Sequence, residues 1–301
     1  MDNIKLLEYC AKYPEKFLDS NYMFMEKDKN LHKYINRTKL IKEKLIAIKE
    51  IINKKNSEAI VDILFEELRK LLDDYANYSE FGAFINACDS KIEETYNDLH
   101  LLKEITKIYL IKRDVNDIVP GEWIQALIDK GSSRKKGHVG ESKLINILIK
   151  KGFKLVNKLN DFKRQKRCVV KSTTGEFSNK KIKQLFKVNI ARGTQDKKID
   201  LIIKNNKSIY FLEAKHLNTG GGGQNKQVLE LSKIIKKKCS NNNYHFVAFL
   251  DGIYSNSLLN ADKLSTTENK IKTQNKDIFK TLKKNKNNYW INTAGFKKLF
   301  I

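Results

Sequence analysis

Residues 199–227 read IDLIIKNNKSIYFLEAKHLNTGGGGQNKQ, and this stretch decides the fold class that we expect for the chain. Two short runs rich in apolar, β-branched and aromatic residues, 199–203 and 208–215, flank the polar sequence KNNK. Two such runs around an Asn-rich break are typical of a β-hairpin. Three charged residues stand out on it: Asp200 near the start of the first strand, and Glu213 and Lys215 at the end of the second.

The register of this hairpin decides which charged residues share a face. A two-residue turn at 205–206 puts Asp200 on the face of Glu213 and Lys215, because side chains alternate along a strand. A four-residue loop keeps that face and sets Glu213 directly opposite Asp200. A three-residue loop without a bulge would separate them.

Two carboxylates and an amine on one face form a set suited to phosphodiester hydrolysis. Neighbouring carboxylates repel each other, and a divalent cation between them relieves the repulsion. Mg²⁺ takes one or two carboxylates and keeps several waters, and such a water can attack a phosphodiester. Lys215 could orient or deprotonate that water, or stabilise the charge developing on the phosphate. The alternative is a surface hairpin with scattered charges, since Glu-x-Lys often occurs by chance.

Asp200, twelve intervening residues and then Glu213-Ala214-Lys215 resemble the signature of the PD-(D/E)XK nuclease superfamily. In that superfamily the Asp and the Glu bind Mg²⁺, and the Lys assists the water. Ile199 stands where the signature has Pro, at a position without a chemical role. The resemblance therefore implies that Asp200 and Glu213 bind the metal and that both act with Lys215 in catalysis.

A helix expected before the sheet adds a third carboxylate. In GHVGESKLINILIKKGF, Leu144, Ile145, Leu148 and Ile149 form a helical face, with Glu141 in the first turn. The helix dipole stabilises a carboxylate there, so the position alone requires no function. Many PD-(D/E)XK nucleases, however, carry a Glu on such a helix that reaches the metal site. The resemblance thus implies Glu141 as a further metal ligand.

The hairpin is followed by four glycines, 220–223, which allow the backbone to pass close to a ligand. A helix is expected from about residue 224 to 238. The sequence lacks the Gly-Lys-Ser/Thr of a phosphate-binding Walker loop. Some restriction endonucleases look similar, with a polar residue of the helix near the metal, which makes Gln224 and Gln227 accessory candidates. A flexible turn and an exposed helix start remain the alternative for each.

The net charge of +24 is unevenly distributed. Residues 1–130 carry 21 Lys and Arg against 24 Asp and Glu, whereas residues 131–301 carry 38 against 11. A region with such an excess attracts polyanions and would bind nucleic acid with marked salt dependence. Compositional drift in a chain rich in Lys, Asn and Ile is the alternative, but drift should affect both halves.

Basic residues concentrate before the hairpin, where 161–198 hold 12 Lys and Arg against 3 Asp and Glu. Such side chains can hold phosphates, and Arg and Gln can also read base edges. The candidate DNA-binding residues are Arg134, Lys135, Lys136, Arg164, Arg167, Arg192 and Gln195.

Apolar residues recur with helical spacing through residues 1–130, which predicts an all-α N-terminal region for dimerisation, DNA recognition or support. The polar, basic sequence 130–137 is the expected boundary or a loop on the DNA backbone. Strands then alternate with helices, including short strands expected at 153–159, 168–170 and 185–188. Residues 131–301 are thus expected to form an α/β (α+β) restriction-endonuclease-like core, with a central mixed β-sheet flanked by helices.

Together these features predict a type II restriction endonuclease that uses Mg²⁺ to hydrolyse double-stranded DNA at a short specific sequence. The resemblance further implies a homodimer and a companion DNA methyltransferase. No apolar run approaches the roughly 20 residues of a membrane span, and the N-terminus lacks the pattern of a signal peptide, so a soluble cytoplasmic protein is expected. Two alternatives stay open: another PD-(D/E)XK nuclease for repair, recombination or RNA, and a catalytically silent DNA-binding protein.

Overall fold

The computed structural model divides the chain into two compact units. Unit 1 comprises Met1–Met23 and Arg134–Ile301, and unit 2 comprises Phe24–Ser133. The structure describes residues 1–23, 26–54, 58–131, 133–171, 175–188, 199–219, 222–238, 241–261 and 269–300. Within these ranges, no helix is long and apolar enough to cross a membrane.

Unit 2 is all-helical, as the sequence predicts, and its helices enclose a core that includes Ile41, Phe65 and Tyr109. Residues 92–112 form two helices, because the Asp98 side chain accepts a hydrogen bond from the Leu101 amide and begins a new helix. The cap expected at Ser57 lies outside the described residues. The helices of unit 2 are α2 (Leu31–Asn53), α3 (Glu58–Lys70), η2 (Asp74–Tyr78), α4 (Glu80–Ala87), α5 (Ile92–Asn97), α6 (Leu99–Lys112) and α7 (Gly121–Lys130).

Unit 1 is built around a six-stranded mixed sheet with the strand order β1-β2-β3-β4-β5-β6. Strands β2, β3 and β4 are antiparallel neighbours, whereas β1 runs parallel to β2, and β4, β5 and β6 are parallel. The expected fold class, a mixed sheet flanked by helices after an all-α region, is confirmed. The strands are β1 (Lys154–Leu155), β2 (Arg167–Lys171), β3 (Leu201–Asn205), β4 (Ser208–His216), β5 (Tyr244–Asp251) and β6 (Tyr289–Ile291).

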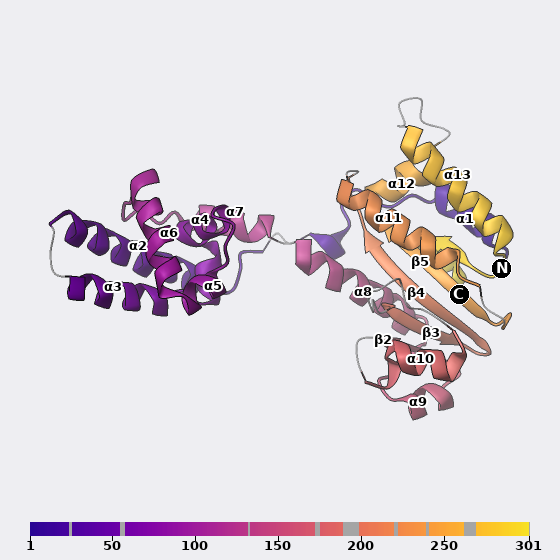
Figure 1. The fold of residues 1–301 in the computed structure, drawn as a ribbon. Helices are drawn as coiled ribbons and strands as arrows, with labels where there is room; N and C mark the ends of the chain where they lie inside the picture. The colour runs from indigo at the N-terminus through magenta and orange to yellow at the C-terminus, as the bar shows by residue number, and fades with distance from the viewer. Residues whose placement is uncertain are drawn as a thin grey trace. The chain divides into compact units, whose positions relative to one another are not determined.

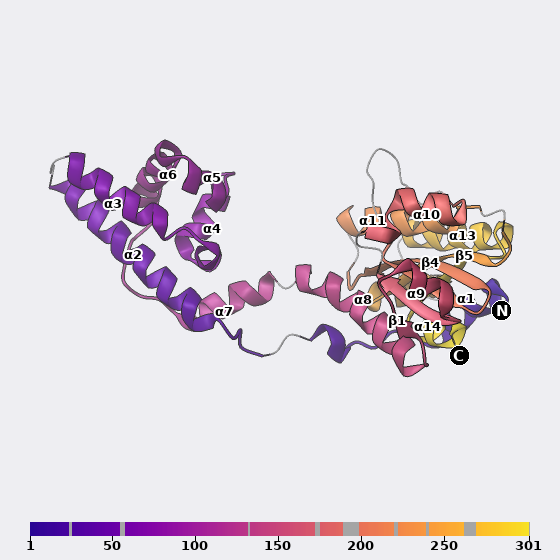
Figure 2. The same cartoon turned by 90° about the horizontal axis from the view of Figure 1, so that it is seen from below.

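Helices cover both faces of the sheet (Figures 1 and 2). On one face, α8, α1 and α14 bury residues such as Leu148 against Leu212 of β4. On the other face, α9 and α10 pack over β2 to β4, while α11, α12 and α13 pack over β4 to β6. The helices are α1 (Asn3–Lys12), η1 (Ser20–Tyr22), α8 (Ser133–Lys150), α9 (Leu159–Arg164), η3 (Gly175–Phe177), α10 (Asn179–Phe186), α11 (Gly222–Ile235), α12 (Ile253–Leu259), α13 (Asn269–Lys284) and α14 (Thr293–Leu299).

The N-terminal segment corrects the predicted division at residue 130. Residues 1–23 belong to the unit that contains the sheet, although the sequence predicts that they join the helical region. The physical reason is burial: Leu6 and Cys10 of α1 lie in the core on the α8 side of the sheet. The Asn3 side chain also donates hydrogen bonds to the backbone oxygens of Leu282 and Asn288, far along the chain.

We expect Leu6→Ala to lower the free energy of unfolding of unit 1 by about 2–5 kcal/mol, because it opens a cavity in a filled core. The side chain of Leu6 is 1% exposed. Leu18→Ala is the matched control, since Leu18 is 76% exposed and its loss should cost less than about 0.5 kcal/mol. Urea denaturation monitored by tryptophan fluorescence measures both. Equal stability of the two variants would contradict the packing of the N-terminal segment.

Two local predictions before the hairpin are wrong. The two units divide between Ser133 and Arg134, within the segment 130–137 expected as a boundary or loop, but residues 133–137 lie in the first turns of α8 and form no loop. The helix is therefore longer at its N-terminus than predicted, and Glu141 lies in its interior instead of its first turn. Residues 185–188, expected as a strand, include the end of α10, which stops at Lys187 in the left-handed conformation (φ 53°). The apolar spacing of Ile182 and Phe186 fits a helix equally well, and burial under Phe162 and Phe211 decided between them.

Candidate active site

The β3–β4 hairpin has its turn one residue later than the two-residue turn considered from the sequence. Asn205 pairs with Ser208, so Asn206 and Lys207 form the turn, and Asn206 adopts φ 55°. Asn tolerates this left-handed conformation better than most residues. Leu201 pairs with Leu212, which sets Asp200 beside Glu213 where the ladder ends. The shift moves the pairing by an even number of residues and therefore keeps the expected shared face.

Asp200 and Glu213 form a close acidic pair at this end of the sheet. The Asp200 carboxylate accepts a hydrogen bond from the Ala214 amide at 2.7 Å, and the Asp200 amide donates to the Leu212 oxygen. Glu213 is 3% exposed. Burial, and after it the negative charge of Glu213, raise the pKa of the Asp200 carboxyl to about 7. The charge of Glu213 thus destabilises the ionised form of Asp200 unless a cation lies between the two carboxylates.

Lys215 completes the set predicted from the sequence. Its ammonium lies 2.8 Å from Glu213 Oε1, and both side chains are on the same face of β4. Burial alone would lower the pKa of Lys215, but the charge of Glu213 and the hydrogen bond to it raise the pKa above its ordinary value. The side chain is therefore a cation at neutral pH. Of the three roles considered from the sequence, orienting water and stabilising charge suit a cation better than accepting a proton does.

Glu141 of α8 lies near this set but has a partner of its own. Its carboxylate forms an ion pair of 2.9 Å with Lys171 at the end of β2. Lys171 pairs with Leu201, directly next to Asp200 in the chain. The charge of Glu141 contributes to the raised pKa of Asp200, which shows that the two carboxylates interact. The structure therefore brings all four predicted groups to the same end of the strands β2, β3 and β4.

The donor set fits a hard divalent cation. Two adjacent carboxylates supply the hard oxygen ligands that Mg²⁺ takes, with waters completing the shell, and burial and the charge of Glu213 raise the pKa of one of them, Asp200. A protein cage of three or more ligands does not occur: within the described ranges, no three His, Cys, Asp or Glu side chains are grouped to hold a metal ion. Glu141, held by Lys171, accordingly stands outside the pair formed by Asp200 and Glu213.

Comparison with known proteins gives the family context for this geometry. Residues 150–282 match the DpnII restriction endonuclease family. The resemblance to type II restriction endonucleases is thereby confirmed. No curated protein and no solved structure gives a significant match to the chain.

The DpnII match includes Asp200, Glu213 and Lys215, and it spans the sheet from β1 to β5. The match begins after Glu141. The assignment of Glu141 to the site therefore depends on the geometry of this chain and on the resemblance to the wider superfamily. The match likewise leaves out the helical unit and the N-terminal segment.

The accessory candidates within the DpnII match lie in the first two turns of α11. Gln224 and Gln227 are both half-buried. The helix also carries Glu230, one turn after Gln227, and the charge of Glu230 contributes to the raised pKa of Lys215. This face of α11 is therefore near the candidate site. Glycines 220 and 221 lie outside the described residues.

Of the candidate DNA-binding residues, the structure describes the side chains of Arg164 and Arg167. Arg164, in the last turn of α9, is exposed. Arg167 begins β2, at the end away from Lys171, and its guanidinium lies 4.4 Å from the centre of the Phe153 ring. Such stacking is a packing contact, and the DNA-binding role of Arg167 stays a prediction. Arg192 and Gln195 lie outside the described residues. The segment with Arg134, Lys135 and Lys136 is helical, without described side chains.

Two charged neighbours of the site, Lys171 and Glu230, were not predicted from the sequence. Lys171 appears in the sequence as one of many basic residues, and only its pairing with Leu201 places it beside Asp200. Glu230 follows Gln227 by three residues, which puts both on one face of the helix, and this spacing could have indicated Glu230 as a neighbour of the site.

Proposed function

We propose that the protein is a type II restriction endonuclease that hydrolyses phosphodiester bonds of double-stranded DNA at a short specific sequence, with Mg²⁺ as its cofactor. One observation carries the proposal. Asp200 and Glu213 are adjacent carboxylates at one end of the β3–β4 ladder, and Lys215 forms an ion pair with Glu213. The match to the DpnII restriction endonuclease family supports the same reaction class. A catalytically silent DNA-binding protein would gain nothing from such a repulsive pair.

Each residue of the set has a distinct part in this proposal. Asp200 and Glu213 would hold Mg²⁺, and Glu141 would support the site from α8. When bound, the metal would lower the pKa of a water and offset negative charge on the phosphate. The Lys215 ammonium would orient the attacking water and stabilise the charge that builds on the scissile phosphate. Lys171 would hold the Glu141 carboxylate in place through their 2.9 Å ion pair.

The wider setting follows from the same proposal. A symmetric double-strand cut at a short site is made most simply by a homodimer, with one active site for each strand. A companion DNA methyltransferase would protect host DNA in the cytoplasm, where both would act. The basic residues of the second half of the chain would hold the DNA backbone, so binding should weaken steeply with salt.

Incubation of plasmid DNA with the protein, in Mg²⁺ or in EDTA, tests the proposal directly. Discrete fragments formed only with Mg²⁺ are the expected result. A smear would instead indicate a non-specific nuclease, and gel retardation without cleavage would indicate a DNA-binding protein. Sequencing the ends of the fragments then gives the recognition sequence. Size-exclusion chromatography with light scattering, with and without DNA, tests the proposed homodimer.

A further inference from the structure

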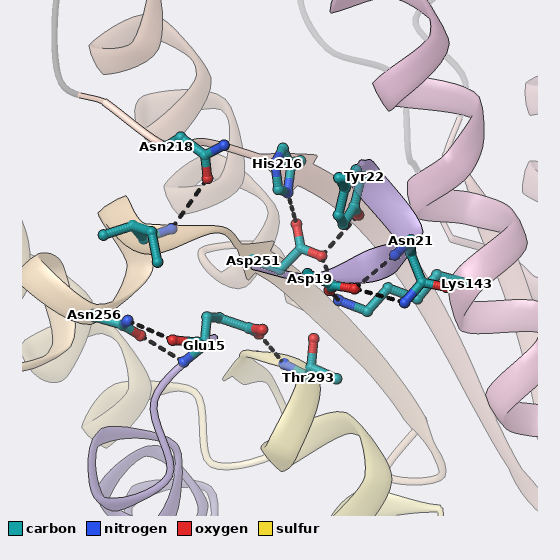
Figure 3. Close-up of polar contacts among 11 residues, drawn as sticks. Glu15, Asp19, Asn21, Tyr22, Lys143, His216, Asn218, Asp251, Asn256 and Thr293 are labelled. Atoms are coloured by element: carbon teal, nitrogen blue, oxygen red, sulfur yellow. Dashed lines mark hydrogen bonds and ion pairs between the residues drawn. The ribbon is translucent and has the colours of Figure 1, made fainter. Parts of the chain in front are cut away.

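A buried carboxylate lies at the centre of a polar cluster (Figure 3). The register of β4 and β5 puts this carboxylate on the sheet face opposite Lys215. Asp251, at the end of β5, is fully buried. One of its oxygens lies 2.7 Å from His216 Nδ1. The other accepts hydrogen bonds from the Tyr22 hydroxyl at 2.7 Å and from the Lys143 ammonium at 2.9 Å. Asp251 thus joins β4, the N-terminal segment and α8.

The cluster sets one ammonium, that of Lys143, between two carboxylates, Asp251 and Asp19. Lys143 has a 5% exposed side chain and binds a second carboxylate, Asp19, at 2.7 Å. Burial opposes the charge of Lys143, yet Asp251 and Asp19 raise its pKa, so the ammonium persists. Burial and the charge of Asp251 raise the pKa of Tyr22, which keeps its hydroxyl a donor. The Tyr22 ring stacks on His216 with centroids 3.7 Å apart, which fixes the imidazole in a second direction.

The members of this cluster directly neighbour the candidate active site in the chain. His216 follows Lys215 on β4, so it points to the opposite face and holds the strand end from behind. Lys143 follows Glu141 by two residues on α8. One buried carboxylate therefore fixes both the strand that carries Lys215 and the helix that carries Glu141.

Two residues of the cluster, Tyr22 and Lys143, lie on the two chain segments that lead into and out of unit 2. Tyr22 lies two residues before Phe24, where unit 2 begins, and α8 begins where the chain leaves that unit at Ser133. Asp251 thus holds the entering and the returning chain at the end of the catalytic strand.

We propose that Asp251 is a positioning residue of the nuclease site, and that it acts through His216, Lys143 and Tyr22 to hold the ends of β4 and α8 in register. This inference rests on the proposed nuclease function for its effect on cleavage. A displacement of about 1 Å at a reacting group can lower a rate by about a hundredfold, so a loosened strand end should act on turnover more than on DNA binding.

Tyr22→Phe is the sharpest test, because it removes one hydrogen bond to Asp251 and keeps the ring on His216. We expect kcat for Mg²⁺-dependent cleavage to fall about tenfold or more, with KM for DNA unchanged. Tyr254→Phe is the matched control: its hydroxyl bonds Gln274 at 3.2 Å, away from the cluster, and kcat should stay at the wild-type value. Asn256→Ala, which removes bonds to the Glu15 backbone, should lower Tm without lowering kcat in the folded protein.

Hydrogen exchange separates this inference from the proposed function. In Tyr22→Phe, amides at the end of β4 and in α8 near Lys143 should exchange faster, while those of β6 should not. Asp251→Asn should extend the effect, with Asp251→Glu as a second variant if it does not fold. Unchanged exchange in Tyr22→Phe, or a kcat loss that merely follows Tm in all variants, would overturn the positioning role. Failure of the wild type to cleave DNA would overturn the nuclease proposal and leave the exchange result decisive for Asp251.

Discussion

Replacement of Asp200 by asparagine is expected to lower the rate of Mg²⁺-dependent DNA cleavage by about a thousandfold or more. Asparagine keeps the shape and can still accept the hydrogen bond from the Ala214 amide, which is 2.7 Å long in the wild type. It removes the negative charge that would hold the cation beside Glu213. Single-turnover cleavage of a labelled oligonucleotide that contains the recognition sequence measures the effect. DNA binding in EDTA should persist or strengthen, since one negative charge is lost near the phosphates.

Asp277→Asn is the matched control for this substitution. Asp277 is an aspartate of the same unit that pairs with Lys236 at the far end of α11, and its side chain is 43% exposed. Cleavage by this variant should stay near the wild-type rate. If Asp200→Asn also cut at the wild-type rate, the assignment of the metal site would be wrong, whatever family the chain resembles.

The same substitution is expected to stabilise the folded protein at neutral pH. Burial beside Glu213 raises the pKa of Asp200 from 3.8 to about 7. The folded state therefore holds this proton more tightly than the unfolded state does. Stability from this group is complete below pH about 4 and declines as the pH rises through about 7. Asp200→Asn removes that decline, so its free energy of unfolding at pH 8 should exceed the wild-type value by about 2–4 kcal/mol, allowing for partial exposure.

Urea denaturation in EDTA at pH 5 and at pH 8 measures this difference. The gain should be small at pH 5 and large at pH 8. Mg²⁺ should stabilise the wild type at pH 8 by binding the ionised pair, and it should stabilise Asp200→Asn much less. Equal loss of stability at both pH values would show that Asp200 stabilises the fold by packing, and that repulsion between its carboxylate and Glu213 does not destabilise the fold.

These two expectations describe one property, the repulsion between Asp200 and Glu213. A stable fold would avoid two neighbouring buried carboxylates, whereas a site for a divalent cation requires them. Lys215 offsets only part of the repulsion, because the pKa of Asp200 remains raised in its presence. Stability and cleavage rate are thus expected to change in opposite directions when Asp200 is replaced.

The sequence by itself determined the local chemistry of the site and the class of the fold. Alternation along 208–215 places Glu213 and Lys215 on one face in any register, because successive side chains of a strand point to opposite faces. The apolar runs 199–203 and 208–215 predicted the hairpin of β3 and β4, and helical spacing predicted the all-helical unit 2. These features depend on neighbours in the chain, so they can be read from it.

Only the tertiary structure decided which distant residues complete the site. Lys171 reaches Glu141 because β2 pairs with β3, and Asp251 reaches Tyr22 and Lys143 across more than a hundred residues of chain. The same holds for the N-terminal segment, whose helical spacing fits either unit equally well. Its place was decided by burial of Leu6 and Cys10 against the sheet. Such contacts follow from the packing of whole faces, which the order of residues along one helix or strand does not specify.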